Sequence, residues 1–151
     1  MRAIIADILS TKGEATGYSS LAPGADQLFA EEVLAAACPL VFVQPVFPDG
    51  EAHYAGVDFE RQARETIPAY GPTPDEAYLA AGRTVADLAD MMIFVWDGGP
   101  ARGIGGTADI VAYAESLGKS AMVLDPVLKE SSRIGRPPVS IGSDPTAQGP
   151  A

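Results

Sequence analysis

The sequence is poor in the residues that build disulfides and metal sites. It has one cysteine, Cys38, and one histidine, His53, in 151 residues. A single cysteine excludes an intrachain disulfide and any zinc site that needs several thiolates. A single histidine excludes a histidine-rich metal centre. We therefore expect neither a metal nor a resident cofactor.

Positive charge is also scarce, with 10 Lys and Arg against 20 Asp and Glu and a formal net charge of −10. Binding to nucleic acid through its phosphates, or to an anionic membrane surface, needs a basic face instead. No run approaches the ~20 apolar residues of a membrane span, and the opening residues carry charge too early for a secretory signal. We expect a cytoplasmic protein with no nucleic-acid or membrane partner.

Apolar residues make up 47 % of the chain, which is typical of a folded domain. The apolar runs at 40–43 and 91–96 do not alternate with polar residues, as expected of parallel strands buried on both faces. Apolar spacing and turn residues predict helices at 2–11, 25–37, 57–67, 74–89 and 107–117, and strands at 14–20, 40–43, 91–96 and 121–124. This order predicts a three-layer, Rossmann-like α/β domain over residues 1–130, with a mostly parallel sheet.

The end of the chain differs from the rest. Residues 131–151 contain Pro137, Pro138, Pro145 and Pro150 and few large apolar side chains. Such a segment buries too little surface to offset the entropy of ordering it. The composition therefore predicts a disordered tail.

A glycine-rich loop lies between the apolar strand at 91–96 and the helix that begins at Thr107. Glycine allows a ligand to approach the backbone closely, and the first amides of a helix suit a phosphate. Thr107 adds a hydroxyl and Arg102 a cation. No Gly-Lys-Ser/Thr follows, so this is not a Walker A loop. The alternative interpretation is a long surface turn that only needs flexibility.

A second loop, at 19–26, also joins a strand to a helix, and ligands of such sheets bind at the carboxyl ends of the strands. Asp26 is alternatively a favourable partner of the helix dipole, and Asp97 alternatively forms a turn before Gly98 rather than accepting ribose hydroxyls. The predicted ligand-binding residues are Ser19, Ser20, Gly24, Ala25, Asp26, Asp97, Gly98, Gly103, Gly105, Gly106 and Thr107.

Five segments, in this order, resemble the SLOG superfamily of Rossmann-like nucleotide-binding domains: 20–26 (SLAPGAD), 29–31 (FAE), 44–48 (QPVFP), 90–98 (DMMIFVWDG) and 105–109 (GGTAD). This superfamily includes the Lonely-Guy phosphoribohydrolases and ligand-sensing domains related to DNA-processing protein A, and the nucleoside 2-deoxyribosyltransferases are its neighbours. The resemblance covers about residues 14–124. It implies a nucleotide or nucleotide-derived ligand, with its phosphate at residues 105–107 and the 20–26 loop lining the same pocket.

Two features depart from that superfamily. The catalytic glutamates of the Lonely-Guy enzymes and of the deoxyribosyltransferases both align with Ile110, which can neither attack an anomeric carbon nor stabilise an oxocarbenium ion. Asp109 lies one position away, roughly 100° round the helix. Members also usually begin with a central strand, whereas this chain begins at the helix that would follow it. This departure implies either a truncated start or a member that lacks one wall of the pocket. In the second case a gap in the sheet favours pairing with a second chain, so a homodimer is one assembly to expect.

Two functions remain open from the sequence. The first is binding or sensing of a nucleotide or nucleotide-derived ligand without chemistry. The second is hydrolysis or transfer at the N-glycosidic bond of nucleoside monophosphates, with Asp97 or Asp109 steadying positive charge and Arg83 or Arg102 holding the phosphate. A degenerate copy that binds nothing is the third interpretation.

Overall fold

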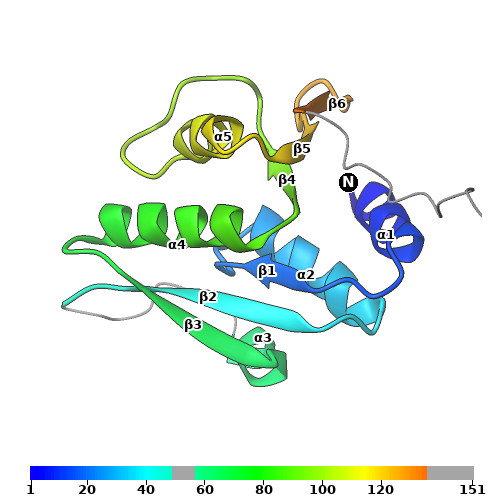
Figure 1. Cartoon of the computed structure of the whole chain (residues 1–151), viewed down its shortest axis with the longest axis horizontal. Helices are drawn as coiled ribbons and strands as arrows, with labels where there is room; N and C mark the ends of the chain where they lie inside the picture. The colour runs from blue at the N-terminus through cyan, green and yellow to red at the C-terminus, as the bar shows by residue number, and fades with distance from the viewer. Residues whose placement is uncertain (49–56, 136–151) are drawn as a thin grey trace, which may run out of the picture.

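The computed structural model describes residues 1–48 and 57–135, in which helices and strands alternate (Figure 1). The elements are α1 (Arg2–Thr11), β1 (Gly17–Ser19), α2 (Ala25–Ala35), β2 (Leu40–Val46), α3 (Val57–Gln62), β3 (Glu65–Tyr70), α4 (Pro74–Leu88), β4 (Met91–Val95), α5 (Thr107–Ser116), β5 (Ser120–Leu124) and β6 (Ser131–Ile134). No helix among these residues is long and apolar enough to cross a membrane.

The strands form two sheets of three rather than one. In the first sheet β1, β2 and β3 are parallel, with Tyr18 beside Val41 and Phe42 beside Thr66. In the second, β4 is parallel to β5 and β6 is antiparallel to β5. The α/β class and the parallel strands confirm the prediction, but the single Rossmann-like sheet is corrected. Within the described residues no strand joins β1 to β4, so each sheet ends there.

Helices cover both faces of the first sheet. Alternate residues of a strand point to opposite faces, so Leu40 and Phe42 pack with the cluster that includes Ile5 and Val33 of α1 and α2, while Val43 packs against Ala81 of α4. In the view of Figure 1, α4 lies between this sheet and α5. The side chains of α4 therefore contribute to the core on both sides of the helix.

The second sheet shares these helices. Met92 and Phe94 of β4 belong to a buried cluster with Ala86 of α4 and Ile110 of α5. Ile93, between them in sequence, packs against the cluster formed by α1 and α2. The unpaired edge of β4 is thus flanked by helices on both faces.

Two strands were missed by the sequence analysis. The range 57–67 was predicted as one helix, but α3 ends at Gln62 and β3 begins at Glu65. β3 is an edge strand with mostly exposed residues, so its sequence shows no apolar run. Pro68 lies inside it, and an edge strand tolerates a proline because the backbone amides on its outer side form no ladder hydrogen bonds. β6 lies inside the range 131–151 that was predicted as a tail, so its first four residues are corrected to strand.

The remaining boundaries follow the predictions closely. β2 extends to Val46, three residues beyond the predicted strand end. Thr73 caps α4, with its hydroxyl accepting a hydrogen bond from the Glu76 amide at 3.3 Å and Pro74 opening the helix. Residues 49–56 and 136–151 lie outside the described residues.

Gly17 allows β1 and α2 to approach closely, and its replacement tests the packing of this layer. A Cβ at Gly17 would lie 2.5 and 2.9 Å from the two methyl groups of Val33. We expect Gly17→Ala to lower the free energy of unfolding by about 1–3 kcal/mol, as overpacking does in other cores. Urea unfolding followed by circular dichroism measures this difference.

A double-mutant cycle provides the control. In a Val33→Ala background the clashing methyl groups are gone, so the second substitution, Gly17→Ala, is expected to cost clearly less. An equal cost in both backgrounds would show that the contact with Val33 does not set the distance between β1 and α2.

Candidate functional site

A cavity of about 710 Å³ lies between the two sheets, and both loops predicted to bind ligand open into it. Its lining includes Ser19, Ser20, Ala25 and Asp26 from the first loop and Gly105 and Thr107 from the second. Cavities that hold small ligands commonly measure 300–1,000 Å³. The structure therefore brings together two segments that lie about 80 residues apart in the sequence.

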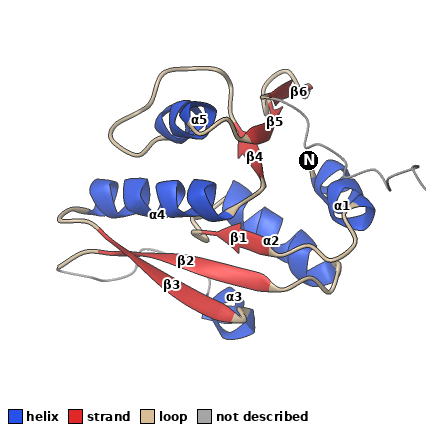
Figure 2. Ribbon diagram, in the orientation of Figure 1, coloured by secondary structure: helices blue, strands red, loops and turns tan. Residues whose placement is uncertain are grey.

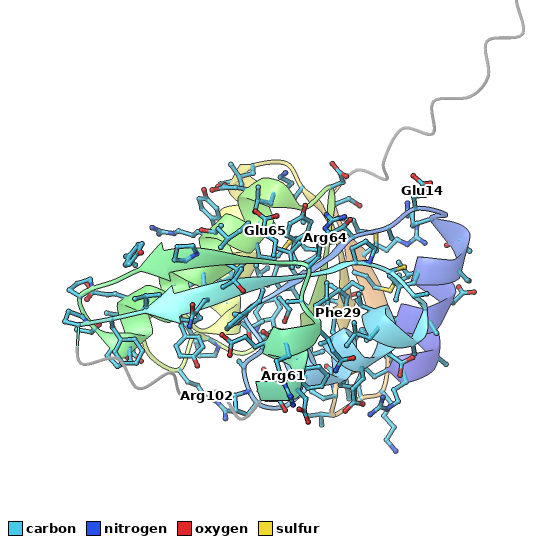
Figure 3. All side chains as sticks on the ribbon, turned by 90° about the horizontal axis from the view of Figure 1, so that it is seen from below. Glu14, Phe29, Arg61, Arg64, Glu65 and Arg102 are labelled. Atoms are coloured by element: carbon cyan, nitrogen blue, oxygen red, sulfur yellow. The ribbon has the colours of Figure 1, made fainter. Side chains whose placement is uncertain are left out.

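The remaining lining is contributed by helices and by the unpaired strand edges. Apolar side chains dominate it, and all five residues of β4 take part. Glu14 and Phe29, which Figure 3 labels, lie in this lining as well. The cavity thus has a polar end at the carboxyl ends of β1 and β4, an apolar section between the sheets, and charged residues that precede the two strands, Lys12, Glu14 and Asp90.

The first loop is held in shape by Asp26. Its carboxylate oxygen Oδ2 accepts a hydrogen bond from the Ser20 hydroxyl at 2.7 Å and from the Ala22 amide at 3.3 Å. The buried Ser19 hydroxyl accepts the Leu21 amide at 3.1 Å, and Leu21 is fully buried with φ = 56°. A leucine in the left-handed region is strained, and such strain persists only where the surrounding contacts impose it.

The polar end also holds Tyr78, which the sequence analysis missed. This residue is half-buried on α4 and lines the cavity together with Gly82 and Val85 of the same helix. Burial, and then the negative charge of Asp26, raise the pKa of Tyr78 above that of a free tyrosine. The phenol therefore stays protonated at neutral pH and can donate a hydrogen bond. Its spacing of four and seven residues from Gly82 and Val85 is the sequence signal that places it on this face.

The second loop reaches the cavity through its last residues. Gly105 has φ = 80°, and a Cβ there would lie 2.8 Å from the backbone oxygen of Asp75. Only glycine fits this contact between the loop and the start of α4. Gly105 donates its amide to Asp109 Oδ2 at 2.9 Å, whereas the amides of Thr107 and Ala108 open α5 and have no acceptor within the helix.

In the earlier part of this loop, side chains form hydrogen bonds with the loop's own backbone. Asp97 Oδ1 accepts the Gly99 amide at 2.9 Å, and the Trp96 indole donates to the Gly99 carbonyl at 2.8 Å. Asp97 thus forms the turn that was its alternative interpretation. Arg102 lies 3.8 Å from Asp97 Oδ2 with 93 % of its side chain exposed, and Figure 3 shows it at the surface. The long loop between β4 and α5 is visible in Figure 2.

Not all predicted site residues reach the cavity. Asp97, Gly98, Gly103, Gly24 and Gly106 are not among its described lining residues, although Gly24 and Gly106 are the N-caps of α2 and α5.

Ile110, the residue that aligns with the catalytic glutamates of the resembled enzymes, is buried, lines the cavity and packs against Gly82. The other candidate catalytic residues besides Asp97 are placed as follows. Asp109 is exposed and faces the Gly105 amide. Arg83 lies over the ring of Tyr113, 5.3 Å from its centroid, outside the cavity lining. In the part of the chain that the structure describes, no cluster of His, Cys, Asp or Glu could hold a metal ion.

No protein-family model matches this chain, and no curated protein or solved structure matches it either.

The raised pKa of Tyr78 leads to a prediction about alkaline stability. The protonated phenol contributes stability that is fully present below the pKa of the unfolded state, about 10, and is lost as pH rises through the higher pKa of the folded state. Above pH 10 we expect the free energy of unfolding to fall less steeply in Tyr78→Phe than in the unsubstituted protein. Urea titrations at several pH values measure the slope.

Tyr70→Phe is the matched control, because it removes a phenol that is 72 % exposed and lies away from the cavity. The same pH dependence in Tyr78→Phe and in the unsubstituted protein would contradict the buried environment assigned to Tyr78.

Proposed function

We propose that this protein binds a nucleotide or nucleotide-derived ligand at the polar end of the cavity between its sheets. One observation carries the proposal: the loops around Ser20–Asp26 and Gly105–Thr107, selected separately from the sequence, line one cavity. They meet at the carboxyl ends of β1 and β4, where ligands of parallel sheets bind. The resemblance to the SLOG superfamily also supports a nucleotide or nucleotide-derived ligand.

The two sides of the polar end suit different parts of such a ligand. The free amides of Thr107 and Ala108, the Thr107 hydroxyl and the positive end of the α5 dipole favour a phosphate. Asp26 and the hydroxyls of Ser20 and Tyr78 favour sugar hydroxyls, because a carboxylate accepts hydrogen bonds and repels a second anion.

The net charge of −10 does not oppose this arrangement strongly. At physiological ionic strength, exposed charges are screened over about 8 Å, whereas helix amides act on a phosphate in direct contact. The acidic surface is therefore expected to slow association more than it weakens the bound state.

Binding is favoured over glycosidic chemistry by the side chain at position 110. Ile110 lines the cavity and carries no group that can act as nucleophile, acid or base. Asp109 accepts a backbone amide of its own loop. Neither arrangement supports an attack on an anomeric carbon, so we assign the site to binding or sensing.

Nucleoside 5′-monophosphates, with AMP first, test the proposal. At 100 times its dissociation constant a ligand adds ~2.7 kcal/mol to the free energy of unfolding, so melting temperature should rise clearly with millimolar AMP. Thr107→Val is expected to weaken AMP binding about tenfold, because it removes a hydrogen bond to a charged group. Calorimetric titration measures the affinities.

Thr84→Val provides the control, since Thr84 donates to the Ala80 carbonyl on α4 and does not line the cavity. It should bind AMP like the unsubstituted protein. No stabilisation by any monophosphate at millimolar concentration would refute binding. Release of free base that Asp109→Asn abolishes would instead establish the hydrolase.

A further inference from the structure

The two sheets present unpaired edges to the same cavity. β1 lies at the end of the first sheet and β4 at the end of the second, and each pairs with a neighbour on one side only. Tyr18 and Ser19 of β1 line the cavity together with the whole of β4, Met91–Val95. All five residues of β4 therefore border the cavity.

The backbone of these edges is oriented for pairing. Gly17 donates its amide to Pro39 in the first sheet, and Trp96 donates to Leu124 in the second. Because consecutive residues of a strand turn their amides to opposite sides, Tyr18 and the residues Ile93 and Val95 direct theirs toward the cavity. A buried backbone amide without a partner costs about as much as a lost hydrogen bond.

The walls of the section between the edges are apolar on both faces. Ile5, Leu9 and Phe29 line one side from α1 and α2, and Val85 and Ile110 line the other from α4 and α5. The charged lining residues come from the segments that flank β1 and β4, namely Lys12, Glu14, Asp26 and Asp90. A molecule bound in the apolar section therefore contacts backbone polar groups of β1 and β4 along its two sides and apolar side chains of the helices on its two faces.

We propose that this section binds an extended, uncharged, proline-free peptide segment of another polypeptide, which pairs with the edges of both β1 and β4. Only an extended backbone supplies donors and acceptors along two opposite sides, whereas a helix uses its own and a lipid chain has none. Five residues, at about 3.3 Å each, match the length of β4. The bound segment joins the two sheets in the order β3-β2-β1-segment-β4-β5-β6.

This interaction goes beyond the nucleotide site and does not depend on it. The peptide occupies the apolar section between the strands, while the nucleotide lies at their carboxyl ends. The same protein sample therefore allows AMP binding and peptide binding to be measured separately, and either is able to fail alone.

The test uses a fluorescein-labelled synthetic peptide, Gly-Ser-Thr-Val-Ile-Val-Ile-Thr-Ser-Gly, and the full chain. We expect saturable binding by fluorescence anisotropy, with at least about tenfold slower hydrogen exchange at the amides of Tyr18 and Ile93. The matched peptide has proline in place of its second Val and second Ile, which keeps it apolar but removes two donors. It should not bind.

Two variants of α1 locate the binding section. Ile8 lines the cavity and is half-buried, so Ile8→Glu places a carboxylate against the apolar segment and should weaken binding at least about tenfold. Ser10→Glu adds the same charge at an exposed position of the same helix and should bind as before.

Three results would overturn the proposal. Equal binding of both peptides would indicate adsorption to an apolar surface without backbone pairing. Unchanged exchange at Tyr18 and Ile93 on binding would place the peptide elsewhere. Protection of these amides in the free protein, with a dimer in light scattering, would show that a second copy covers the edges.

Discussion

The two sheets share no strand pairing among the described residues, so the side chains of α4 hold them in position. Ala81 of α4 packs against the first sheet and Ala86 against the second, while Val85 contacts the clusters of both. The close approach of α5 depends on Gly82, where a Cβ would lie 2.6 Å from Ile110. Side-chain packing on α4, whose buried faces carry small residues, thus connects the two sheets where no strand-to-strand hydrogen bonds connect them.

This arrangement explains why the cavity has two different parts. Between the sheets, buried apolar walls border backbone groups that lack a strand partner. At the carboxyl ends of β1 and β4, loops and helix starts add hydroxyls, amides and the carboxylate of Asp26. The proposed strand pairing and the proposed anion binding both rely on backbone amides. Between the sheets, the apolar walls strengthen such hydrogen bonds because they keep competing water away.

The helices and the buried strands were predictable because apolar spacing reports burial directly. Met91–Val95 is apolar throughout and forms a strand with helices on both faces, and the capping residues Thr73 and Pro74 mark where α4 begins. β3 and β6 were not predictable in this way, since edge strands are exposed and carry no regular pattern. Of the candidate site, the loops around Ser20 and Gly105 were found from glycines and helix starts. Tyr78 was missed because its spacing from Gly82 and Val85 places it on one face of α4 but does not show that this face borders a cavity.

The sequence by itself determined the alternation of helices and strands, the acidic charge, the lack of disulfides and the loops that hold the candidate ligand-binding groups. It determined them because each depends on composition or on residues close together in the chain. Only the tertiary structure decided that the strands divide into two sheets, that Asp109 bonds to its own loop, and that α4 brings Tyr78 to the loop around Asp26. These outcomes depend on which surfaces pack together. Packing brings together residues that are far apart in the sequence, and their separation along the chain does not tell how close they lie in space.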